Sequence, residues 1–473
     1  MVRRGTLRAL ALALCTVLAG ALLWALWGFD AYYRQASVNP IAQTTTAANA
    51  SASAGSENTG SGSVQVPSLA QVERGQYLAR VGNCVFCHTA PAGALLAGGR
   101  AITTPFGTVY TSNLTPDAAH GLGRWTPNDF WQALHLGLDP QGQRLSPAFP
   151  YTSYSRLTRT DADALWAYLQ SVPAVPRPQA DANMVWPLGT QTALGLWRAM
   201  YFRPFQDARE SAAPDGADPV AWTRGRYLVE GLGHCQECHS PRDALGGLRN
   251  ASRGTGGVLP GLPWYAPSLR DTAQAGATDG PALQSFLQTG LGAGRFATGP
   301  MAEVVLHGTQ YLSDADAQAM VVYLQSLVAM KVGSAMPPPH QDADKSRLES
   351  SNSIAMGNTS AAQVQGADIY KNHCANCHGD QGQGRQSVYP ALAGNRALLM
   401  DRPHNAVLSV LYGGFAPSTH GNAQPFGMPP FMLELSNAQI AQVLSYARSA
   451  WGNQAAPISE LQVQAVRDPQ QGR

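Results

Sequence analysis

The chain has 473 residues, of which 44% are hydrophobic and 13% charged, and its formal net charge at pH 7 is +2. This length suggests about three domains. A nearly balanced charge provides no strongly basic surface, so nucleic acid is not an expected partner.

The amino terminus has the pattern of a membrane anchor. Arg3, Arg4 and Arg8 precede an uncharged run over 9–29, which as a helix would span about 31 Å, enough to cross a bilayer core. We therefore expect residues 1–30 to form an N-terminal transmembrane helix, with the rest of the chain on the periplasmic side. A cleavable signal peptide is the alternative, and it would export the rest of the chain equally. Cys15 lies inside this run and is interpreted as an apolar filler.

Several stretches of the chain are poor in large apolar side chains or rich in proline and small polar residues. Such segments cannot bury a core of their own and are typical of linkers. We expect a flexible linker over 31–69, a connecting segment over 176–220, a second linker over 331–362 and a flexible tail over 454–473.

Between these breaks the sequence repeats three times. Each repeat is expected to open with a helix that ends in a cysteine pair, over 72–88, 223–239 and 364–378. Each is expected to close with a second helix, over 157–172, 312–327 and 435–450. Thr160, Ser313 and Ser436 are the expected N-caps of the closing helices.

A glycine recurs in each opening helix and a tyrosine near the end of each closing helix. A missing side chain would let the two helices of a repeat cross closely. The glycines are Gly75, Gly225 and Gly366, and the tyrosines are Tyr168, Tyr323 and Tyr446.

The cysteine pairs carry the chemistry. Each has the pattern C-x-x-C-H, which is typical of covalent haem attachment, because two cysteines three apart reach the two vinyl groups of one porphyrin and the adjacent histidine lies under the iron. Three haem c groups are therefore expected. Cys84 and Cys87 would attach the first haem, Cys235 and Cys238 the second, and Cys374 and Cys377 the third, with His88, His239 and His378 as the proximal iron ligands.

Two other uses of such pairs were weighed. Structural zinc needs two ligand pairs for each metal ion and does not require histidine directly after the second cysteine. A redox disulfide would fit an exported protein, but the sequence has no thioredoxin-like βαβ pattern. Both alternatives are weaker than haem c.

Methionine is the expected sixth iron ligand where the haem transfers electrons, because Met/His ligation raises the reduction potential. Met301 follows Gly299-Pro300 and Met428 precedes Pro429-Pro430, each shortly before the closing helix of its repeat. We predict that Met301 and Met428 ligate the iron of the second and third haem.

The first repeat departs from this pattern, since Phe149 stands where methionine would be expected. Either another side chain ligates the iron or this haem is five-coordinate. Met200 is the favoured candidate and Met184 the other, while His120 and His135 are more readily interpreted as surface residues. No nucleotide, flavin or Ser/His/Asp motif is present, so no catalytic residue is expected.

At this point the sequence resembles a known family, the three-haem cytochrome c subunits of bacterial membrane-bound dehydrogenases. The resemblance covers about 70–452. It is carried by TPFGTVYTSNLTPD (104–117), GLGRWTPNDFWQAL (121–134), PAFPYTSYSRLTRTDADALWAYL (147–169), RGRYLVEGLGHCQECHSPR (224–242) and GPMAEVV (299–305).

The resemblance implies a mainly α fold of three consecutive class I cytochrome c domains, over 70–175, 221–330 and 363–453, behind the N-terminal transmembrane helix. It implies a catalytic partner, which in this family is a quinoprotein, a flavoprotein or a molybdenum enzyme, and electron transfer from that partner to ubiquinone or a terminal oxidase. The expected location is the periplasmic side of the inner membrane.

Two other functions stay open at this stage. The chain could be a free-standing carrier between the quinol pool and an oxidase. It could also be a haem peroxidase, if the first haem has an open coordination site, although no acid–base residues beside that site are visible in the sequence.

Overall fold

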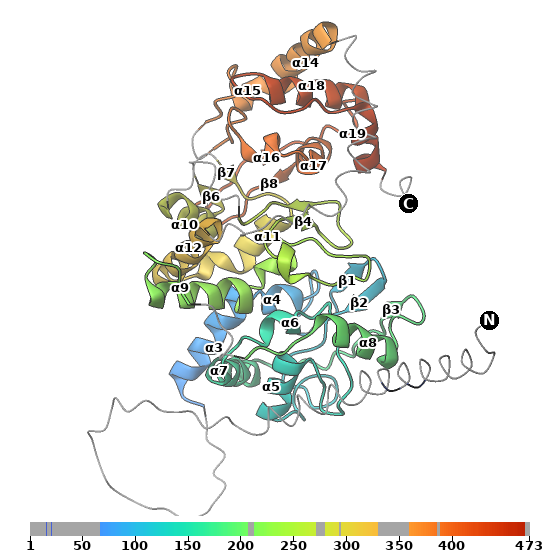
Figure 1. Cartoon of the computed structure of the whole chain (residues 1–473), viewed down its shortest axis with the longest axis vertical. Coiled ribbons are helices and arrows are strands. Elements are labelled where there is room, and N and C mark those ends of the chain that lie inside the picture. Colours follow the sequence, from blue (N-terminus) through green and yellow to red (C-terminus); the bar gives the residue numbers. More distant parts are fainter. Residues whose placement is uncertain are drawn as a thin grey trace, which may run out of the picture. The chain divides into compact units, whose positions relative to one another are not determined.

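The structure is a computed structural model that describes Thr16, Gly20 and residues 67–206, 212–270, 280–292, 295–329, 359–385 and 388–468. It is mainly helical (Figure 1). Residue contacts divide the chain into two compact units. Unit 1 comprises Met1–Ala79 and Cys87–Glu210, and unit 2 comprises Arg80–Phe86 and Ser211–Arg473.

The expected transmembrane helix has to be corrected. In the part of the chain that the structure describes, no helix combines the length and the apolar run that a bilayer requires. The longest described helix has 16 residues, about 24 Å at 1.5 Å per residue, against a hydrocarbon core of about 30 Å. Of the span predicted over 9–29, all but Thr16 and Gly20 lies outside the described residues.

Unit 1 contains the first repeat and the segment that follows it. Its strands form one antiparallel sheet in the order β1-β2-β3, in which Ile102 pairs with Val109 and Gly107 with Met184. The elements are α3 (Leu69–Val81), α4 (Cys84–Cys87), β1 (Ala101–Thr104), β2 (Gly107–Tyr110), α5 (Pro127–Leu136), α6 (Tyr151–Tyr154), α7 (Arg159–Ser171), β3 (Asn183–Met184) and α8 (Gln191–Tyr201). Helices α3 and α4 run into Arg80–Phe86, which groups with unit 2.

Unit 2 contains the second and third repeats. The elements of the second are α9 (Pro219–Arg226), η3 (Tyr227–Leu232), η4 (Cys235–Glu237), η5 (Asn250–Ser252), β4 (Gly257–Val258), β5 (Tyr265–Ala266), α10 (Gly280–Thr289), β6 (Leu291–Gly292), β7 (Arg295–Phe296), α11 (Pro300–His307), η6 (Thr309–Tyr311) and α12 (Asp314–Ala329). The third has α14 (Thr359–His373), α15 (Ala375–His378), α16 (Arg396–Leu399), α17 (His404–Tyr412), β8 (Gly414–Phe415), β9 (Gly427–Met428), α18 (Asn437–Ser449) and α19 (Glu460–Arg467). Within the described residues of this unit, the antiparallel pairs are β4–β5, β6–β7 and β8–β9.

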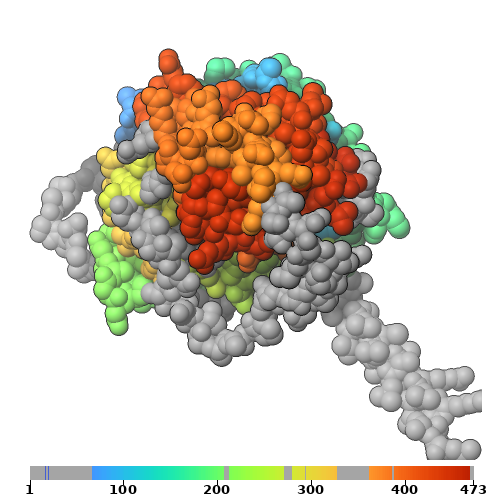
Figure 2. All heavy atoms as spheres, turned by 90° about the horizontal axis from the view of Figure 1, so that it is seen from above, coloured from blue at the N-terminus to red at the C-terminus, as the bar shows by residue number. Residues whose placement is uncertain are grey.

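The predicted close crossing of opening and closing helices is confirmed. A Cβ atom added to Gly75 would lie 1.9 Å from the carbonyl oxygen of Ala164 in α7, and one added to Gly225 would lie 1.9 Å from that of Ala319 in α12. At Gly366 the distance to the carbonyl oxygen of Gln442 in α18 is 2.4 Å. Figure 2 shows the third repeat, where orange atoms of the opening segment lie beside red atoms of the closing one.

The recurrent tyrosines lie at these crossings. The Cβ of Tyr168, Tyr323 or Tyr446 would be 2.8, 2.8 or 2.9 Å from the Cβ added to the glycine of its own repeat. An arginine beside the glycine also pairs with the closing helix in two repeats, since Arg74 Nε lies 2.8 Å from Asp161 and Arg224 Nη2 lies 2.7 Å from Asp316. The repeats therefore share one helix-crossing geometry.

The helix ends differ in part from the prediction. Ser436 caps α18 by accepting from the Gln439 N–H, and Ser313 accepts from Asp316 N–H at the start of α12. The N-cap of α7 is Thr158 and not Thr160, because it is the Thr158 hydroxyl that accepts from the N–H of Asp161.

In the first two repeats the opening helices stop short of the cysteine pairs, whereas in the third α14 runs as expected to His373, directly before Cys374. Helix α3 ends at Val81, and α9 passes into the π-helical turn η3. The next residues have positive φ at Asn83 (56°) and His234 (38°), which breaks the helix before the first cysteine. Residues 454–473, expected to be a flexible tail, contain α19, whose Val463 and Val466 are buried.

Candidate functional site

Each motif places its two cysteines and its histidine within one tight turn. In the second motif the N–H of His239 donates to the carbonyl of Cys235 at 3.0 Å, and in the third the N–H of His378 donates to the carbonyl of Cys374 at 2.9 Å. Cys84 and Cys87 of the first motif bound the one-turn helix α4. The predicted attachment residues are thus brought together locally in each repeat.

The three motif histidines share one hydrogen-bonding pattern. Each ring has its Nδ1 within 2.8 Å of a backbone carbonyl oxygen. The partners are Ser112 for His88 at 2.7 Å, Pro267 for His239 at 2.7 Å and Pro390 for His378 at 2.8 Å. A carbonyl oxygen can only accept, so the proton is on Nδ1, and Nε2 keeps the lone pair that a metal ligand needs.

The electrostatic environment keeps these rings neutral. Burial lowers the pKa of His88, of His239 and of His378, and the hydrogen bond to the carbonyl opposes that shift in each case. Neutral imidazole is the form that binds iron. The rings therefore meet the requirement for a proximal haem ligand in both tautomer and charge.

A glycine completes each histidine turn. The carbonyl of each motif histidine accepts from a glycine N–H, at 2.7 Å from Gly98, 2.9 Å from Gly256 and 2.8 Å from Gly384. All three glycines have positive φ (70°, 86° and 65°), a conformation that other residues adopt only with strain. Sequence reasoning missed these glycines and the carbonyl partners, because their spacing from the motif differs in every repeat.

The thiols do not resemble those of a disulfide-exchange site. None of the six motif cysteines forms a disulfide, and all six are partly buried. Burial raises the pKa of Cys87, that of Cys235 to about 12 and that of Cys374 to about 11, whereas catalytic redox cysteines have lowered values. Among the described residues, no group of three His, Cys, Asp or Glu side chains is placed to hold a metal ion.

The two predicted methionine ligands lie in different kinds of element. Met301 is the second residue of α11 and packs, partly buried, against a small cluster that includes Ala302 and Val305. Met428 is in β9 and packs against the core of the third repeat, as Cys374 does. Their role as iron ligands stays a prediction.

The first repeat has an aromatic cluster where a methionine was expected. Phe149 and Trp197 pack against the buried pair Tyr151 and Phe202. Met184 lies in β3 opposite Gly107, and Met200 is 55% exposed on α8. The sixth ligand of the first haem therefore stays open.

Several other histidines have local partners. His120 pairs with Asp117 at 3.2 Å, and the ring of His135 stacks on Trp131 with centroids 4.6 Å apart. His373 is 36% exposed and lies 4.0 Å from Glu434. His234 is partly buried and hydrogen-bonded to the backbone of Gly82.

The position of His234 predicts an effect of pH on stability. Its burial lowers its pKa in the folded protein, an effect opposed by Glu237 and the Gly82 bond. As the pH falls through about 6.5, His234 takes up a proton in the unfolded chain before it does so in the folded protein. Acidification therefore favours the unfolded chain and lowers the free energy of unfolding. We expect His234→Gln to lose less stability than the parent between pH 7 and pH 5, measured by urea unfolding. His373→Gln should keep the parental slope, and equal slopes for all three proteins would contradict the prediction.

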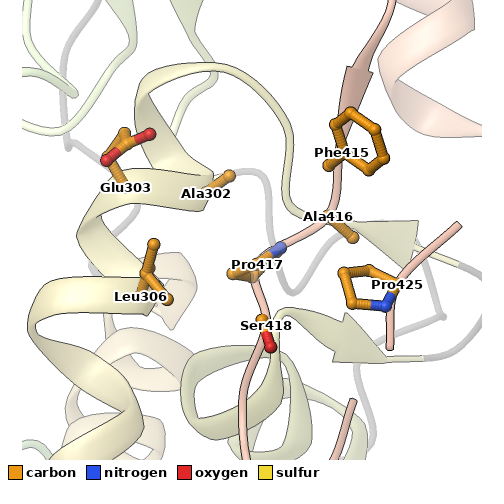
Figure 3. A pocket seen from close by; sticks show the side chains of 8 residues that line it. All are labelled: Ala302, Glu303, Leu306, Phe415, Ala416, Pro417, Ser418 and Pro425. Atoms are coloured by element: carbon orange, nitrogen blue, oxygen red, sulfur yellow. The ribbon is translucent and has the colours of Figure 1, made fainter. Parts of the chain in front are cut away.

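A separate cavity lies in unit 2 between α11 and the loop after β8. It has a volume of about 320 Å³ and is lined by Ala302, Glu303, Leu306, Phe415, Ala416, Pro417, Ser418 and Pro425. Figure 3 shows Phe415 and Pro425 on one side, facing Ala302 and Leu306 of α11 on the other. None of the predicted haem-attaching or iron-ligating residues lines it, but Ala302 directly follows Met301, and Phe415 pairs with Gly427, the neighbour of Met428.

Comparisons with known proteins agree with this chemistry. The family model "Cytochrome c" matches residues 363–451. The chain is 38% identical over 412 residues to the cytochrome c subunit of a quinone alcohol dehydrogenase from Gluconacetobacter polyoxogenes, covering 84% of both chains. It is 34% identical to the fructose dehydrogenase cytochrome subunit of Gluconobacter japonicus, over 84% of this chain and 82% of the relative. It is 35% identical to the gluconate 2-dehydrogenase cytochrome c subunit of Pantoea cypripedii, over 84% and 90%.

The fold and the motif geometry define a c-type cytochrome, which carries covalently bound haem c. More narrowly, the chain belongs to the family of cytochrome c subunits of bacterial dehydrogenases, which confirms the resemblance found in the sequence. It is an electron-transfer subunit and not a catalytic one.

Proposed function

We propose that the chain holds three haem c groups and passes electrons from a catalytic dehydrogenase subunit to ubiquinone. The number of haems is supported by the shared geometry of the motif histidines. In each, Nδ1 is hydrogen-bonded to a backbone carbonyl, and the histidine's own carbonyl accepts from a glycine N–H. A motif that had lost its haem would have no reason to keep both bonds. Bound haem supplies one-electron Fe(III)/Fe(II) chemistry, and the chain's residues position it and set its potential.

The partner and the acceptor are proposed from the relatives. Alcohol, fructose and gluconate dehydrogenases each have a cytochrome subunit similar to this chain, and one of those enzymes is named for quinone. The partner would accordingly be a quinoprotein, flavoprotein or molybdenum enzyme. We place the complex on the periplasmic side of the inner membrane, because thioether attachment of haem in bacteria is carried out after export and leaves the electron carrier there.

The haem count is tested by a pyridine haemochrome assay on chain matured in a host that assembles c-type cytochromes. We expect about three haems for each chain, and about two when Cys235 and Cys238 are both replaced with alanine. A parent value near one would contradict the proposal, as would a double variant that keeps the parental count.

The electron acceptor is tested separately, by mixing the fully reduced holoprotein with ubiquinone-1 in a stopped-flow instrument. Reoxidation of the haem α-band that saturates with ubiquinone-1 concentration is expected. Failure of ubiquinone-1 to reoxidise the protein, while an artificial acceptor such as ferricyanide does so, would contradict ubiquinone as the acceptor. Location is tested by the release or retention of the chain when spheroplasts are prepared and their membranes washed.

A further inference from the structure

The second haem site contacts the third repeat through the backbone of one short segment, Trp264–Ser268, within unit 2. Asn405, the second residue of α17, binds both backbone groups of Tyr265. Its Nδ2 donates to the Tyr265 carbonyl at 2.7 Å, and its Oδ1 accepts from the Tyr265 N–H at 2.9 Å. One side chain, 140 residues away in sequence, thus holds both the N–H and the carbonyl of Tyr265 in place.

A second contact lies on the other side of the same segment. Arg396, the first residue of α16, donates from Nη2 to the carbonyl of Ser268 at 3.2 Å. Between Tyr265 and Ser268 lies Pro267, whose carbonyl accepts from Nδ1 of His239 at 2.7 Å. The third repeat therefore holds the chain on both sides of the group that orients the second motif's histidine.

The same segment also contacts the turn that precedes Met301. The indole of Trp264 packs against the core of the third repeat. The ring also lies next to Gly299, where an added Cβ would be 2.6 Å from it. Gly299 has a φ of 53° and directly precedes Pro300 and Met301. Both segments that would position iron ligands in the second repeat therefore rest on Trp264–Ser268.

Arg396 also places a charge near this site. Its guanidinium donates to the carbonyl of Ser268, the residue directly after Pro267, whose own carbonyl accepts from the imidazole of His239. The charge therefore lies one residue from the group that orients the ring. A fixed positive charge disfavours the more positive oxidised iron relative to the reduced iron, which raises the reduction potential.

We propose that the third repeat completes the second haem site, with Arg396 raising the reduction potential of that haem through its charge and Asn405 positioning the Pro267 carbonyl that orients His239. This inference rests on the proposed function, since it requires haem at the second motif. Arg396 and Asn405 are positioning residues that act through the Trp264–Ser268 segment and through electrostatics, without being iron ligands.

The test is a spectroscopic redox titration of the full holoprotein. Arg396→Gln keeps an amide donor for the Ser268 carbonyl but removes the charge. It should shift one of the three haem components toward lower potential by about tenfold in its oxidation equilibrium, or about 59 mV for a one-electron couple. Arg396→Lys should restore most of the shift. Arg249→Gln removes an arginine of the second repeat whose side chain is 66% exposed, and it should leave all three components in place.

Asn405→Ala should move the same component in the opposite direction. Loosening the Pro267 carbonyl weakens its bond to Nδ1 of His239. The imidazole then becomes a poorer donor to oxidised iron, so the reduction potential of this haem rises, with a change of about twofold to threefold in its oxidation equilibrium. Opposite signs for the two variants distinguish this positioning role from general disruption, which would shift both in one direction.

The remaining outcomes separate this inference from the proposed function. A parent protein that holds fewer than three haems would contradict the proposed function. Three haems with no component moved by Arg396→Gln would overturn the inference alone. So would a shift that Arg249→Gln reproduces, or one that persists in the Cys235→Ala/Cys238→Ala background, where the second haem is absent.

Discussion

Replacing Met428 with histidine is expected to lower the midpoint potential of one haem by on the order of 0.2 V, a part of the range of about 0.8 V that axial ligands cover. Thioether sulfur stabilises reduced iron, and imidazole stabilises oxidised iron. The measurement is a redox titration of the three haems, with the total haem count taken from the pyridine haemochrome.

Met428 lies in a tightly packed part of the third repeat. It lies in β9, paired with Gly414 across the hairpin, and packs against the same core as Cys374 of the third motif. The carbonyl of Met428 lies so close to Gly413 that a Cβ there would be 2.2 Å from it. The backbone of the predicted ligand is therefore held firmly, and a substitution changes the donor atom more than the loop.

A matched control comes from the same core. Met432 also packs against it, four residues further along the chain. Met432→Leu should leave the potentials unchanged, because it preserves volume and alters no predicted ligand. If Met428→His moves no component, or moves one no more than Met432→Leu does, the assignment of Met428 as sixth ligand is wrong.

Features that depend on neighbouring residues could be predicted from the sequence. The C-x-x-C-H motifs predicted haem c, and the recurrence of Gly75, Gly225 and Gly366 predicted close helix crossings, which the structure has. Both signals are local or periodic, so one sequence is enough to reveal them. The N-cap of α7 was placed two residues too far along, at Thr160, because Thr158 is also a good cap and the sequence does not say which hydroxyl faces the N–H of Asp161.

Features that depend on distant partners could not be predicted. The carbonyls of Ser112, Pro267 and Pro390 bind their histidines at separations of 24, 28 and 12 residues, and backbone carbonyls have no sequence signature. The bonds of Asn405 to Tyr265 join residues 140 apart. Such contacts follow from how two repeats pack, and composition or period does not encode that packing.

The helix crossing in the second repeat leads to a prediction in which sterics oppose helix propensity. Alanine at position 225 would favour the helical backbone by up to about 1 kcal/mol relative to glycine. Its Cβ, however, would lie 1.9 Å from the Ala319 carbonyl oxygen and 2.8 Å from Cβ of Tyr323, so backbone would have to move. We expect Gly225→Ala to lower the free energy of unfolding by about 2–3 kcal/mol, the cost of overpacking a tight core.

The two helices have little freedom to separate and relieve this clash. The Trp222 Nε1–H donates to the Ser326 hydroxyl at 2.8 Å, and Arg224 makes two hydrogen bonds to Asp316, at 2.8 and 2.7 Å. The Tyr323 hydroxyl donates to Glu230 at 2.5 Å. Widening the crossing would strain or break these bonds, most of them partly buried, each contributing on the order of 1 kcal/mol.

The measurement is the urea midpoint of the holoprotein, followed by far-ultraviolet circular dichroism. Val220→Ala is the control in the same helix, because Val220 is 80% exposed and surface substitutions usually change stability by no more than about 0.5 kcal/mol. Gly225→Ala should therefore unfold at clearly lower urea than both the parent and Val220→Ala. A Gly225→Ala variant as stable as the parent would mean that α9 and α12 cross less closely than the distance between Gly225 and Ala319 implies. That result would contradict the close helix crossing inferred for all three repeats.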